Sequence, residues 1–221
     1  MKASTNLLPD EGRHNIKTTI ASIVKASALF DVPAIVVFAA NADSVLRVRE
    51  SIDDSRKVIA VTFPAGYVAL VNDSASYVGI YTRGDQDRLR DARVELIQGV
   101  MPFEAVGSSE HDAFFLFRSA LNLFGGGMKL CLQAVVMACD AGAVTGGQKC
   151  IAMSADTAIV AHTENSFNII NSRSRLAVEH IICKPVAYSI SRPSVVEIKS
   201  VQISVSGQSD HAALQNQDEA H

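Results

Sequence analysis

The stretch Ala34-Ile35-Val36-Val37-Phe38-Ala39 decides the fold of this chain. It is a continuous apolar run, rich in β-branched residues, and such a run is typical of a strand that is covered on both faces. A second run, Lys57-Val58-Ile59-Ala60-Val61-Thr62, follows after a short stretch of helical spacing that begins with Asp43 as its cap. Strand, helix and strand form a βαβ unit, which predicts two parallel strands joined by a right-handed crossover.

Further elements extend this unit in both directions. Asn15 offers a side-chain cap, and Ile20, Ile23 and Val24 follow it at helical spacing, which predicts a helix that ends near Phe30. Downstream, the pattern predicts a loop at 63–85 with a short strand at 77–81, a helix at 86–99, a strand at 101–106, largely buried helices at 112–123 and 128–141, short strands at 149–153, 157–162 and 177–183, and a last strand at 195–205. The polar residues 206–221 are expected to be disordered.

The bulk composition excludes several classes of protein. The chain has 221 residues, of which 48% are hydrophobic and 19% charged, and we expect most of it to form one folded domain. A net charge of −3 gives no positive field for nucleic acid, and the longest apolar run, Val32 to Ala40, is too short to cross a bilayer. Residues 1–12 contain no apolar stretch typical of a secretory signal, so we expect a cytoplasmic protein with no membrane partner.

The four cysteines do not suggest a metal centre. Cys131, Cys139, Cys150 and Cys183 show no paired C-x-x-C spacing and no histidines at zinc-finger intervals. We therefore expect no metal, and we interpret all four as small buried hydrophobic residues.

Two glycine-rich motifs carry a resemblance to a known family. The chain reads Phe124-Gly125-Gly126-Gly127-Met128-Lys129 and then Val135-Val136-Met137-Ala138-Cys139-Asp140-Ala141-Gly142. Weaker agreements are Asn15 with Thr18, Ala155-Asp156-Thr157-Ala158, and Lys184-Pro185. Over roughly residues 13 to 186, the sequence resembles the stand-alone proteins of the pyruvate kinase C-terminal (alpha/beta) domain family.

This resemblance implies an α/β fold, a three-layer sandwich with a mostly parallel sheet and, here, an added β region near the C-terminus. It covers the domain at 13–186 and leaves an N-terminal segment at 1–12 and an extension at 187–221, in which the sequence pattern predicts one strand and then the disordered tail. It also implies a flavin mononucleotide (FMN) site at the carboxyl ends of the parallel strands, where helix N-termini and the strand ends leave a crevice. The kinase's catalytic barrel is a separate domain, so the resemblance does not imply kinase chemistry.

The loop after the first strand departs from the family pattern. Relatives carry a loop of the form Ser-Thr-Ser-Gly-x-Thr there, whereas this chain reads Ala39-Ala40-Asn41-Ala42-Asp43-Ser44. Only Ser44 keeps a hydroxyl in register, and the charge of Asp43 is expected to repel phosphate. Thr62 carries a second hydroxyl at the end of the next predicted strand, and both residues are candidate ligand contacts.

His111 is a further candidate, just past the predicted strand at 101–106 and next to Glu110. An imidazole in that position suits a base or a hydrogen-bond partner for a ring-shaped ligand, while a loop histidine without a role is the alternative. Gly125, Gly126 and Gly127 open a helix and offer backbone N–H groups to an anion, with Lys129 as the counter-charge. The alternative for these glycines is a corner where two helices pack closely, and for Lys129 an exposed surface position.

The remaining candidates are Asn15, Thr18, Asp156 and Thr157, and each also has a structural interpretation. Asn15 and Thr18 can cap the first helix, and Asp156 and Thr157 can close a hairpin. The leading hypothesis is a protein that binds a small phosphorylated or flavin-type nucleotide. The alternatives are a structural or regulatory module that acts as a homo-oligomer after losing its ligand site, and an enzyme that uses His111 with Glu110 as acid and base.

Overall fold

The computed structural model describes residues 3–71, 74–77, 79, 81–104, 113–169, 171 and 173–189. The predicted strand at 195–205 and the polar segment at 206–221 lie outside the described residues. In the described part of the chain no helix is both long enough and apolar enough to cross a membrane.

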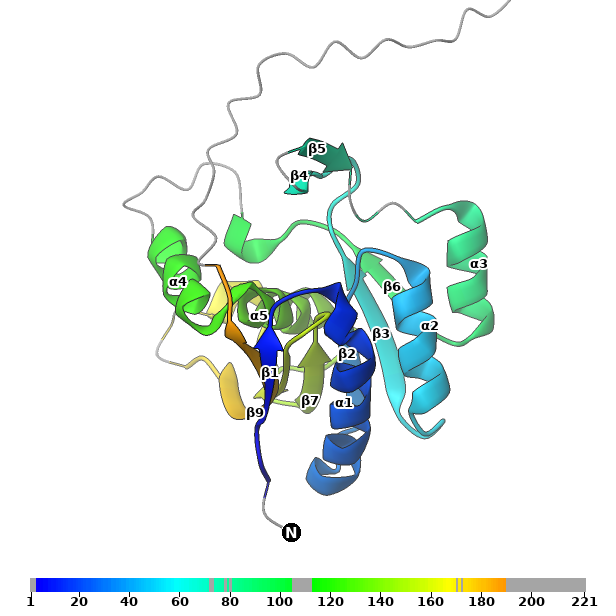
Figure 1. Ribbon diagram of the computed structural model, residues 1–221, viewed down its shortest axis with the longest axis horizontal. Helices are drawn as coiled ribbons and strands as arrows, with labels where there is room; N and C mark the ends of the chain where they lie inside the picture. The colour runs from blue at the N-terminus through cyan, green and yellow to red at the C-terminus, as the bar shows by residue number, and fades with distance from the viewer. Residues whose placement is uncertain are drawn as a thin grey trace, which may run out of the picture. The chain divides into compact units, whose positions relative to one another are not determined.

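Within the described residues, seven strands form one sheet (Figure 1). Their order across the sheet is β1 (Asn6–Asp10), β9 (Ala177–Ala187), β8 (Ala158–His162), β7 (Lys149–Met153), β2 (Ala34–Phe38), β3 (Lys57–Thr62) and β6 (Glu95–Gln98). Strand β8 is antiparallel to both neighbours, and the other pairs are parallel. The expected mostly parallel sheet is confirmed, as is the βαβ unit from β2 to β3.

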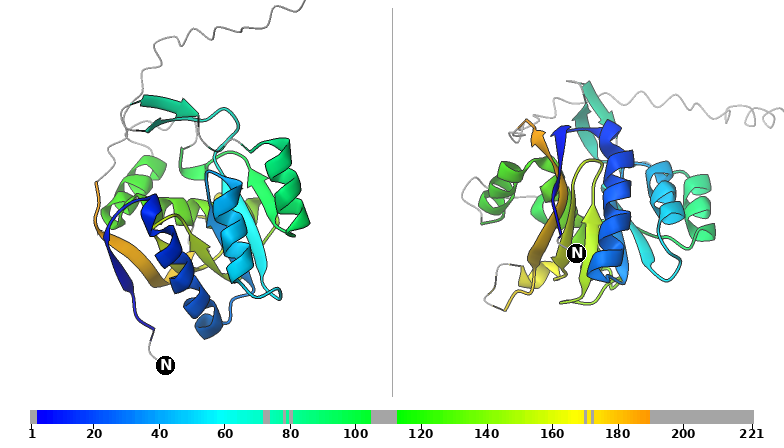
Figure 2. Two further views of the ribbon diagram at one scale, coloured as in Figure 1. Left: turned by 45° about the vertical axis from the view of Figure 1, so that its right-hand side comes forward. Right: turned by 60° about the horizontal axis from the view of Figure 1, so that its bottom comes forward.

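Helices cover both faces of the sheet, which gives three layers (Figure 2). One face is covered by α1 (Ile16–Phe30), α2 (Ala42–Ser51) and α3 (Arg83–Asp91), and the other by α4 (Ala113–Leu121) and α5 (Gly126–Asp140). Short 3-10 helices occur at η1 (Arg13–Asn15), η2 (Pro102–Glu104), η3 (Asn122–Phe124) and η4 (Ser166–Asn168), and β4 (Val68–Val71) forms a separate antiparallel hairpin with β5 (Ser74–Tyr77).

Strand β2 shows why its sequence is apolar throughout. Ile35 and Val37 belong to the core beneath α1 and α2, whereas Ala34, Val36 and Phe38 belong to the core beneath α5. None of the five is more than 5% exposed. Because burial of one large apolar side chain stabilises a fold by roughly 1.5–3 kcal/mol, the strand leaves no position for a polar residue.

The predicted helix at 86–99 is wrong in its second half. Helix α3 ends at Asp91, the chain turns at Arg93 with a positive φ of 57°, and β6 follows. Leu89 and Leu96 have helical spacing because both pack against the same core, one from the helix and one from the strand. Periodicity alone therefore suggested one continuous helix.

Four other expectations are also wrong. The stretch predicted as a strand at 101–106 contains η2 in its described part, and the short strand expected at 77–81 lies earlier, as β5. Helix α4 is not largely buried, because its Leu116 is 61% exposed. The N-cap of α2 is Asn41 rather than Asp43, since the Asn41 side chain accepts a hydrogen bond from the Ser44 N–H.

Strand β1 adds residues 6–10, from the segment at 1–12, to the edge of the sheet. It pairs in parallel with β9, with Asn6 opposite Cys183. Six of the seven strands thus run in one direction, and their carboxyl ends share one edge of the sheet, at the top of Figure 1. We call it the carboxyl edge. Helices α1, α2 and α5 begin there, so their N-termini, with their partial positive charge, face the same side.

Candidate functional site

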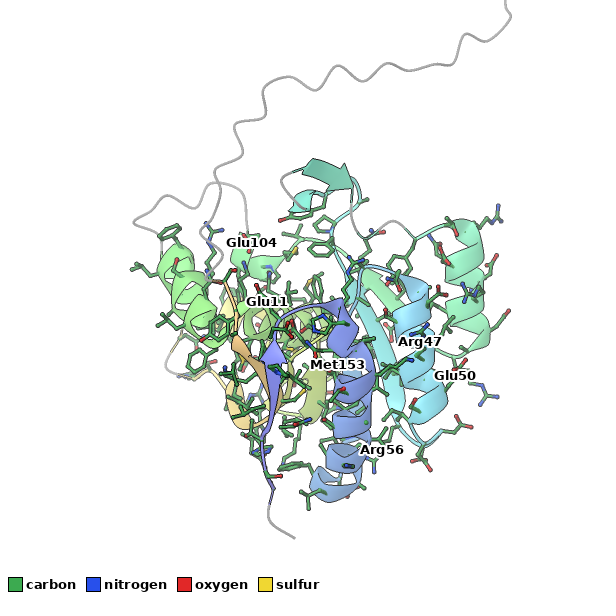
Figure 3. All side chains as sticks on the ribbon, in the orientation of Figure 1. Glu11, Arg47, Glu50, Arg56, Glu104 and Met153 are labelled. Carbon is green, nitrogen blue, oxygen red and sulfur yellow. The ribbon has the colours of Figure 1, made fainter. Side chains whose placement is uncertain are left out.

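Two clusters of polar side chains lie at the carboxyl edge, and they differ in how far they satisfy one another. The first, the turn cluster, surrounds the turn between β7 and β8 and consists of Gly12, Asn15, Thr19, Gly127, Ser154, Asp156 and Thr157. The second, the charged cluster, consists of Glu104, Arg118 and Lys129 (Figure 3, where Glu104 is labelled).

Asp156 is the centre of the turn cluster. Its Oδ2 accepts a hydrogen bond of 2.8 Å from the Gly12 N–H, just before η1. Its Oδ1 accepts hydrogen bonds from the hydroxyl of Thr157 at 3.0 Å and, more weakly, from that of Ser154 at 3.4 Å. The turn itself is closed by the Ser154 N–H, which donates to the Thr157 carbonyl at 2.8 Å. The carboxylate thus joins the β7–β8 turn to the start of α1.

Gly127 packs directly against this turn. A Cβ atom at this position would lie 2.6 Å from Asp156 Oδ1 and 2.7 Å from Thr157 Cβ, closer than real Cβ atoms approach other atoms. The absence of a side chain therefore lets α5 approach the β7–β8 turn. Gly126 is different, because nothing lies within 4 Å of the Cβ that it lacks. Of the three glycines, Gly125 has a positive φ of 95° at the N-cap of α5, where no side chain caps the helix.

Asn15 joins the turn cluster, but Thr18 does not. Asn15 is only 6% exposed, and its side-chain amide donates to the Asp10 carbonyl at 2.8 Å instead of capping α1, so the expected side-chain cap is wrong. Thr18 is exposed on the first turns of α1. The buried Thr19, which the sequence did not single out, donates its hydroxyl to the Ala155 carbonyl at 3.1 Å.

The start of α2 is occupied by the protein's own polar groups. The Asn41 side chain accepts from the Ser44 N–H at 3.0 Å, and Asp43 forms an ion pair of 2.7 Å with Arg88 of α3. Arg88 also contacts Asp85 at 3.3 Å. Ser44 is partly exposed beside these groups, and the charge of Asp43 is balanced by Arg88.

Thr62 is fully buried at the end of β3, and the backbone at Gly79, just after the β4–β5 hairpin, lies against it. A Cβ atom on Gly79 would lie 2.8 Å from the Thr62 hydroxyl, which shows how closely that backbone covers it. Burial raises the pKa of the neighbouring Tyr81 well above its usual value. The Tyr81 hydroxyl donates to the Ala39 carbonyl at 3.1 Å. Thr62 thus contributes to packing between the ends of β2 and β3.

The charged cluster joins η2, α4 and the start of α5. Glu104 accepts from Arg118 at 2.8 Å through one carboxylate oxygen, and Lys129 lies 2.9 Å from the other. The three side chains are only 14% to 22% exposed, so solvent screens their charges less than on an open surface. Two cations share one carboxylate, and the cluster therefore has one net positive charge. Arg118 also lies over the ring of Phe115, with its guanidinium carbon 5.1 Å from the ring centre.

A group of aromatic rings lies at the same edge. Phe63, just after β3, contacts Phe38 edge-on at 4.9 Å and stacks on Tyr67 at 5.1 Å, with the Tyr67 ring only 18° from parallel. The pKa of the Tyr67 hydroxyl is raised by burial and by the negative charge of Glu104, while Arg118 acts in the opposite direction. The charged cluster and the aromatic stack are therefore electrostatically coupled.

The sequence identified part of this arrangement. Four of its candidates, Asn15, Gly127, Asp156 and Thr157, come together in the turn cluster, while Lys129 belongs to the charged cluster. His111 and Glu110 lie outside the described residues. In the part of the chain that the structure describes, no group of three or more His, Cys, Asp or Glu residues is arranged to hold a metal ion.

Glu104, Arg118 and the Phe63–Tyr67 stack were missed by sequence reasoning. Arg118 offered a signal, because it is the one charged residue in the mostly apolar helix α4. An isolated cation in such a helix needs a partner, and its position alone could have identified it as a candidate. Glu104 gave no such signal, since it was included in a predicted strand.

Comparisons with known proteins add little to this geometry. No family model and no curated protein matches the chain. Two solved structures of pyruvate kinase from Cryptosporidium parvum are similar to 67% of the chain, with 13% and 12% sequence identity and a TM-score of 0.36 in both cases. The chain corresponds to only 22% and 23% of the length of those kinases. This is a weak similarity to a pyruvate kinase fold, and it does not place the chain in the family.

Proposed function

We propose that this protein binds a small phosphorylated ligand with a planar ring, a flavin-type nucleotide such as FMN, at the carboxyl edge beside the charged cluster. The observation that carries the proposal is the pairing of Arg118 and Lys129 with the single carboxylate of Glu104. A phosphate group has the charge that this cluster leaves unbalanced. Arginine and lysine are the side chains that most often bind phosphate oxygens.

The aromatic stack supplies the second half of the recognition. Tyr67 is half-buried and already stacks on Phe63, so a planar ring placed against it extends an existing stack. Stacking of a base or a ring on an aromatic side chain contributes about 1–3 kcal/mol to binding. A ligand with both a ring and a phosphate therefore gains from two neighbouring groups, and the motif that resembles the pyruvate kinase C-terminal domain family begins at the same place, at Phe124 to Lys129.

The turn cluster has a different role in this proposal. Its carboxylate and hydroxyls bind one another and backbone groups, so we assign Asp156, Thr157, Asn15 and Gly127 to the support of the edge. The start of α2, with Ser44, is likewise satisfied from within.

Titration with flavins tests the proposal. FMN is added to the full chain and followed by quenching of flavin fluorescence, with riboflavin, which lacks the phosphate, as the matched ligand. We expect FMN to bind at micromolar concentrations and riboflavin at least about 10-fold more weakly, because riboflavin lacks the phosphate that contacts Arg118 and Lys129 in this proposal. A factor of ten in affinity corresponds to about 1.4 kcal/mol. Inorganic phosphate should compete with FMN. Equal affinity for both flavins, or no binding of FMN up to millimolar concentrations, would refute the proposal.

A further inference from the structure

Large apolar side chains are exposed unevenly over the surface. Ten of them are exposed among the described residues, and seven lie on the α5 side of the sheet, around the end formed by β1 and β9. We call these seven the apolar face: Leu7 (59% exposed), Leu116 (61%), Leu123 (64%), Phe124 (45%), Phe167 (91%), Val178 (41%) and Val186 (60%).

The strand residues of this face are placed by alternation along β1 and β9. Asn6 points to the α1 side, since its amide donates to Ser22 of α1, so Leu7 points to the α5 side. Lys184 pairs with Leu7 in the parallel register, and Val186, two residues on, shares that side. The Tyr188 hydroxyl donates to the Leu123 carbonyl at 2.5 Å, which places η3 next to the end of β9.

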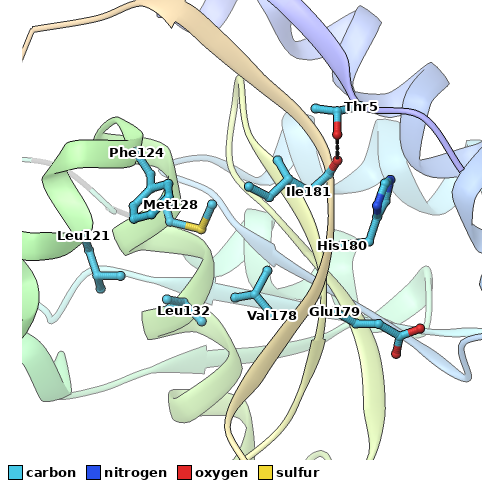
Figure 4. Close-up of a pocket in the computed structure, with 9 residues that line it drawn as sticks. All are labelled: Thr5, Leu121, Phe124, Met128, Leu132, Val178, Glu179, His180 and Ile181. Carbon is cyan, nitrogen blue, oxygen red and sulfur yellow. Dashed lines mark hydrogen bonds between the residues drawn. The ribbon is translucent and has the colours of Figure 1, made fainter.

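The apolar face contains a groove of about 430 Å³ between α5 and β9. Figure 4 shows Leu121, Phe124, Met128 and Leu132 on one side of it and Val178 on the other, while His180 points away. On the α1 side of the sheet His180 stacks on Phe30. The groove thus has mainly hydrophobic walls and is large enough for an aromatic side chain.

The exposed area is close to what a stable dimer needs. If a large apolar side chain presents on the order of 150 Å², the seven residues at these exposures offer roughly 600 Å². This value is at the upper limit for a patch on a monomer, about 300–600 Å², and approaches the ~800 Å² that each partner contributes to a standard interface. The hydrogen-bonding edge of β1 is less suitable, because Pro9 lacks a backbone donor there.

Phe167 and the groove lie beside opposite ends of α5. Phe167 projects from η4, which lies beside the end of α5 because the Ser166 N–H donates to Asp140 at 2.8 Å. The groove lies beside the first half of the same helix, at Met128 to Leu132. In a two-fold dimer, Phe167 of each copy would meet the groove of the other copy, so that the same contact forms twice.

We propose that the apolar face is the surface on which two copies of this chain associate, with Phe167 of each copy in the groove of the other. The inference does not depend on the proposed ligand, whose site lies at the carboxyl edge. The proposed occupant of the groove is a second copy of the chain, and binding of an apolar small molecule there is the competing outcome.

Sedimentation velocity of the full chain over a concentration series tests this interface. We expect a dimer for the wild type and a dissociation constant at least about 10-fold higher for Phe167→Ser. The matched control is Val100→Ser, because Val100 is 74% exposed just after β6, at the opposite end of the sheet, and its loss should leave the dimer unchanged. Circular dichroism and the urea midpoint verify that each variant is folded, as expected for changes at exposed positions.

A mixing experiment then tests the two-fold geometry. Phe124→Ser damages the groove and keeps Phe167, so a mixture with Phe167→Ser restores one complete contact per dimer. The mixture should associate more tightly than either variant alone. A monomeric wild type at about 100 μM, an equal effect of Val100→Ser, or no recovery on mixing would each overturn the proposal, as would a monomer whose groove binds an apolar dye.

Discussion

The turn cluster and the charged cluster lie at the same edge of the sheet, yet they use polar groups in opposite ways. In the turn cluster the carboxylate of Asp156 meets donors from Gly12, Thr157 and Ser154. In the charged cluster one carboxylate meets two cations, Arg118 and Lys129. Polar residues at a strand end therefore do not by themselves indicate a site, and the unbalanced, partly buried charge is what favours the charged cluster in our proposal.

The largest expected effect is a difference in stability between alanine substitutions at two adjacent glycines, Gly127 and Gly126. Gly127→Ala places a Cβ against Thr157 and Asp156, and overpacking of this kind costs typically 1–3 kcal/mol and sometimes more. Gly126 is the first residue of α5, and a Cβ there meets nothing within 4 Å, so Gly126→Ala is expected to raise the free energy of unfolding by about 0.4–1 kcal/mol, because alanine lowers the conformational entropy of the unfolded chain. Urea unfolding of both variants measures the difference. If both substitutions changed the free energy of unfolding in the same direction, the described packing of α5 on the β7–β8 turn would be incorrect.

The charged cluster should respond in ligand affinity. Lys129→Met removes one of the two cations and is expected to weaken FMN binding by about 10- to 100-fold, corresponding to the roughly 1.5–3 kcal/mol of a hydrogen bond to a charged group. Lys149→Met is the control, because Lys149 also pairs with a glutamate, Glu179, at 2.8 Å. Fluorescence titration at low and high salt should show the affinity of the wild type falling with salt. An equal loss of FMN affinity in both variants would contradict the assignment of Lys129 to the ligand site.

The turn cluster should respond in stability and leave the affinity unchanged. Asp156→Ala leaves the Gly12 N–H without its acceptor, and loss of such a partner costs about 1–3 kcal/mol in the free energy of unfolding. The dissociation constant for FMN should remain the same within a factor of two or so, as judged at a temperature where the variant is folded. A variant of normal stability that no longer binds FMN would reverse the roles assigned to the two clusters.

Thiol reactivity provides the smallest and most local test. Burial raises the pKa of Cys150 to about 12 and that of Cys183 to about 11, and it raises the pKa of the fully buried Cys131 as well. Because the thiolate is the reactive form, these three should not react with Ellman's reagent at pH 8 in the native state. The half-buried Cys139 should react slowly, giving one thiol per chain, compared with four in denaturant.

The Gly127→Ala variant sharpens this thiol test. Cys131 donates its Sγ–H to the Thr157 carbonyl at 3.4 Å, so a displaced turn should expose this thiol before the others. A second reactive thiol in Gly127→Ala, identified as Cys131 by mass spectrometry, would connect the helix start to the turn. Rapid reaction of several thiols in the native wild type would contradict the burial of the cysteines.

The sequence predicted the elements whose signal is local. Strand β2 is a continuous apolar run because both of its faces are buried, and this can be recognised without any partner. Strand β1 could not be recognised in this way, because its pairing of Asn6 with Cys183 joins residues far apart in the chain. Strand β6 is short and only half-buried, and Leu96 continues the helical spacing of the preceding helix.

The candidate site was predictable to a similar extent. Gly127, Asp156 and Thr157 belong to compact motifs, so the sequence could identify them, although not their structural role. The charged cluster joins Glu104, Arg118 and Lys129 from three separate elements, and no spacing along the chain encodes that meeting. The charged cluster could therefore be recognised only from the three-dimensional structure.

The most direct test of this account is an NMR titration of the ¹⁵N-labelled full chain with FMN, in which each backbone amide reports on its own surroundings. We predict that the amides of Tyr67, Glu104, Arg118 and Lys129 shift on binding, while those of Gly12, Asp156 and Thr157 do not. Shifts confined to the turn cluster, or no shifts at millimolar FMN, would contradict the claim that the charged cluster binds the ligand.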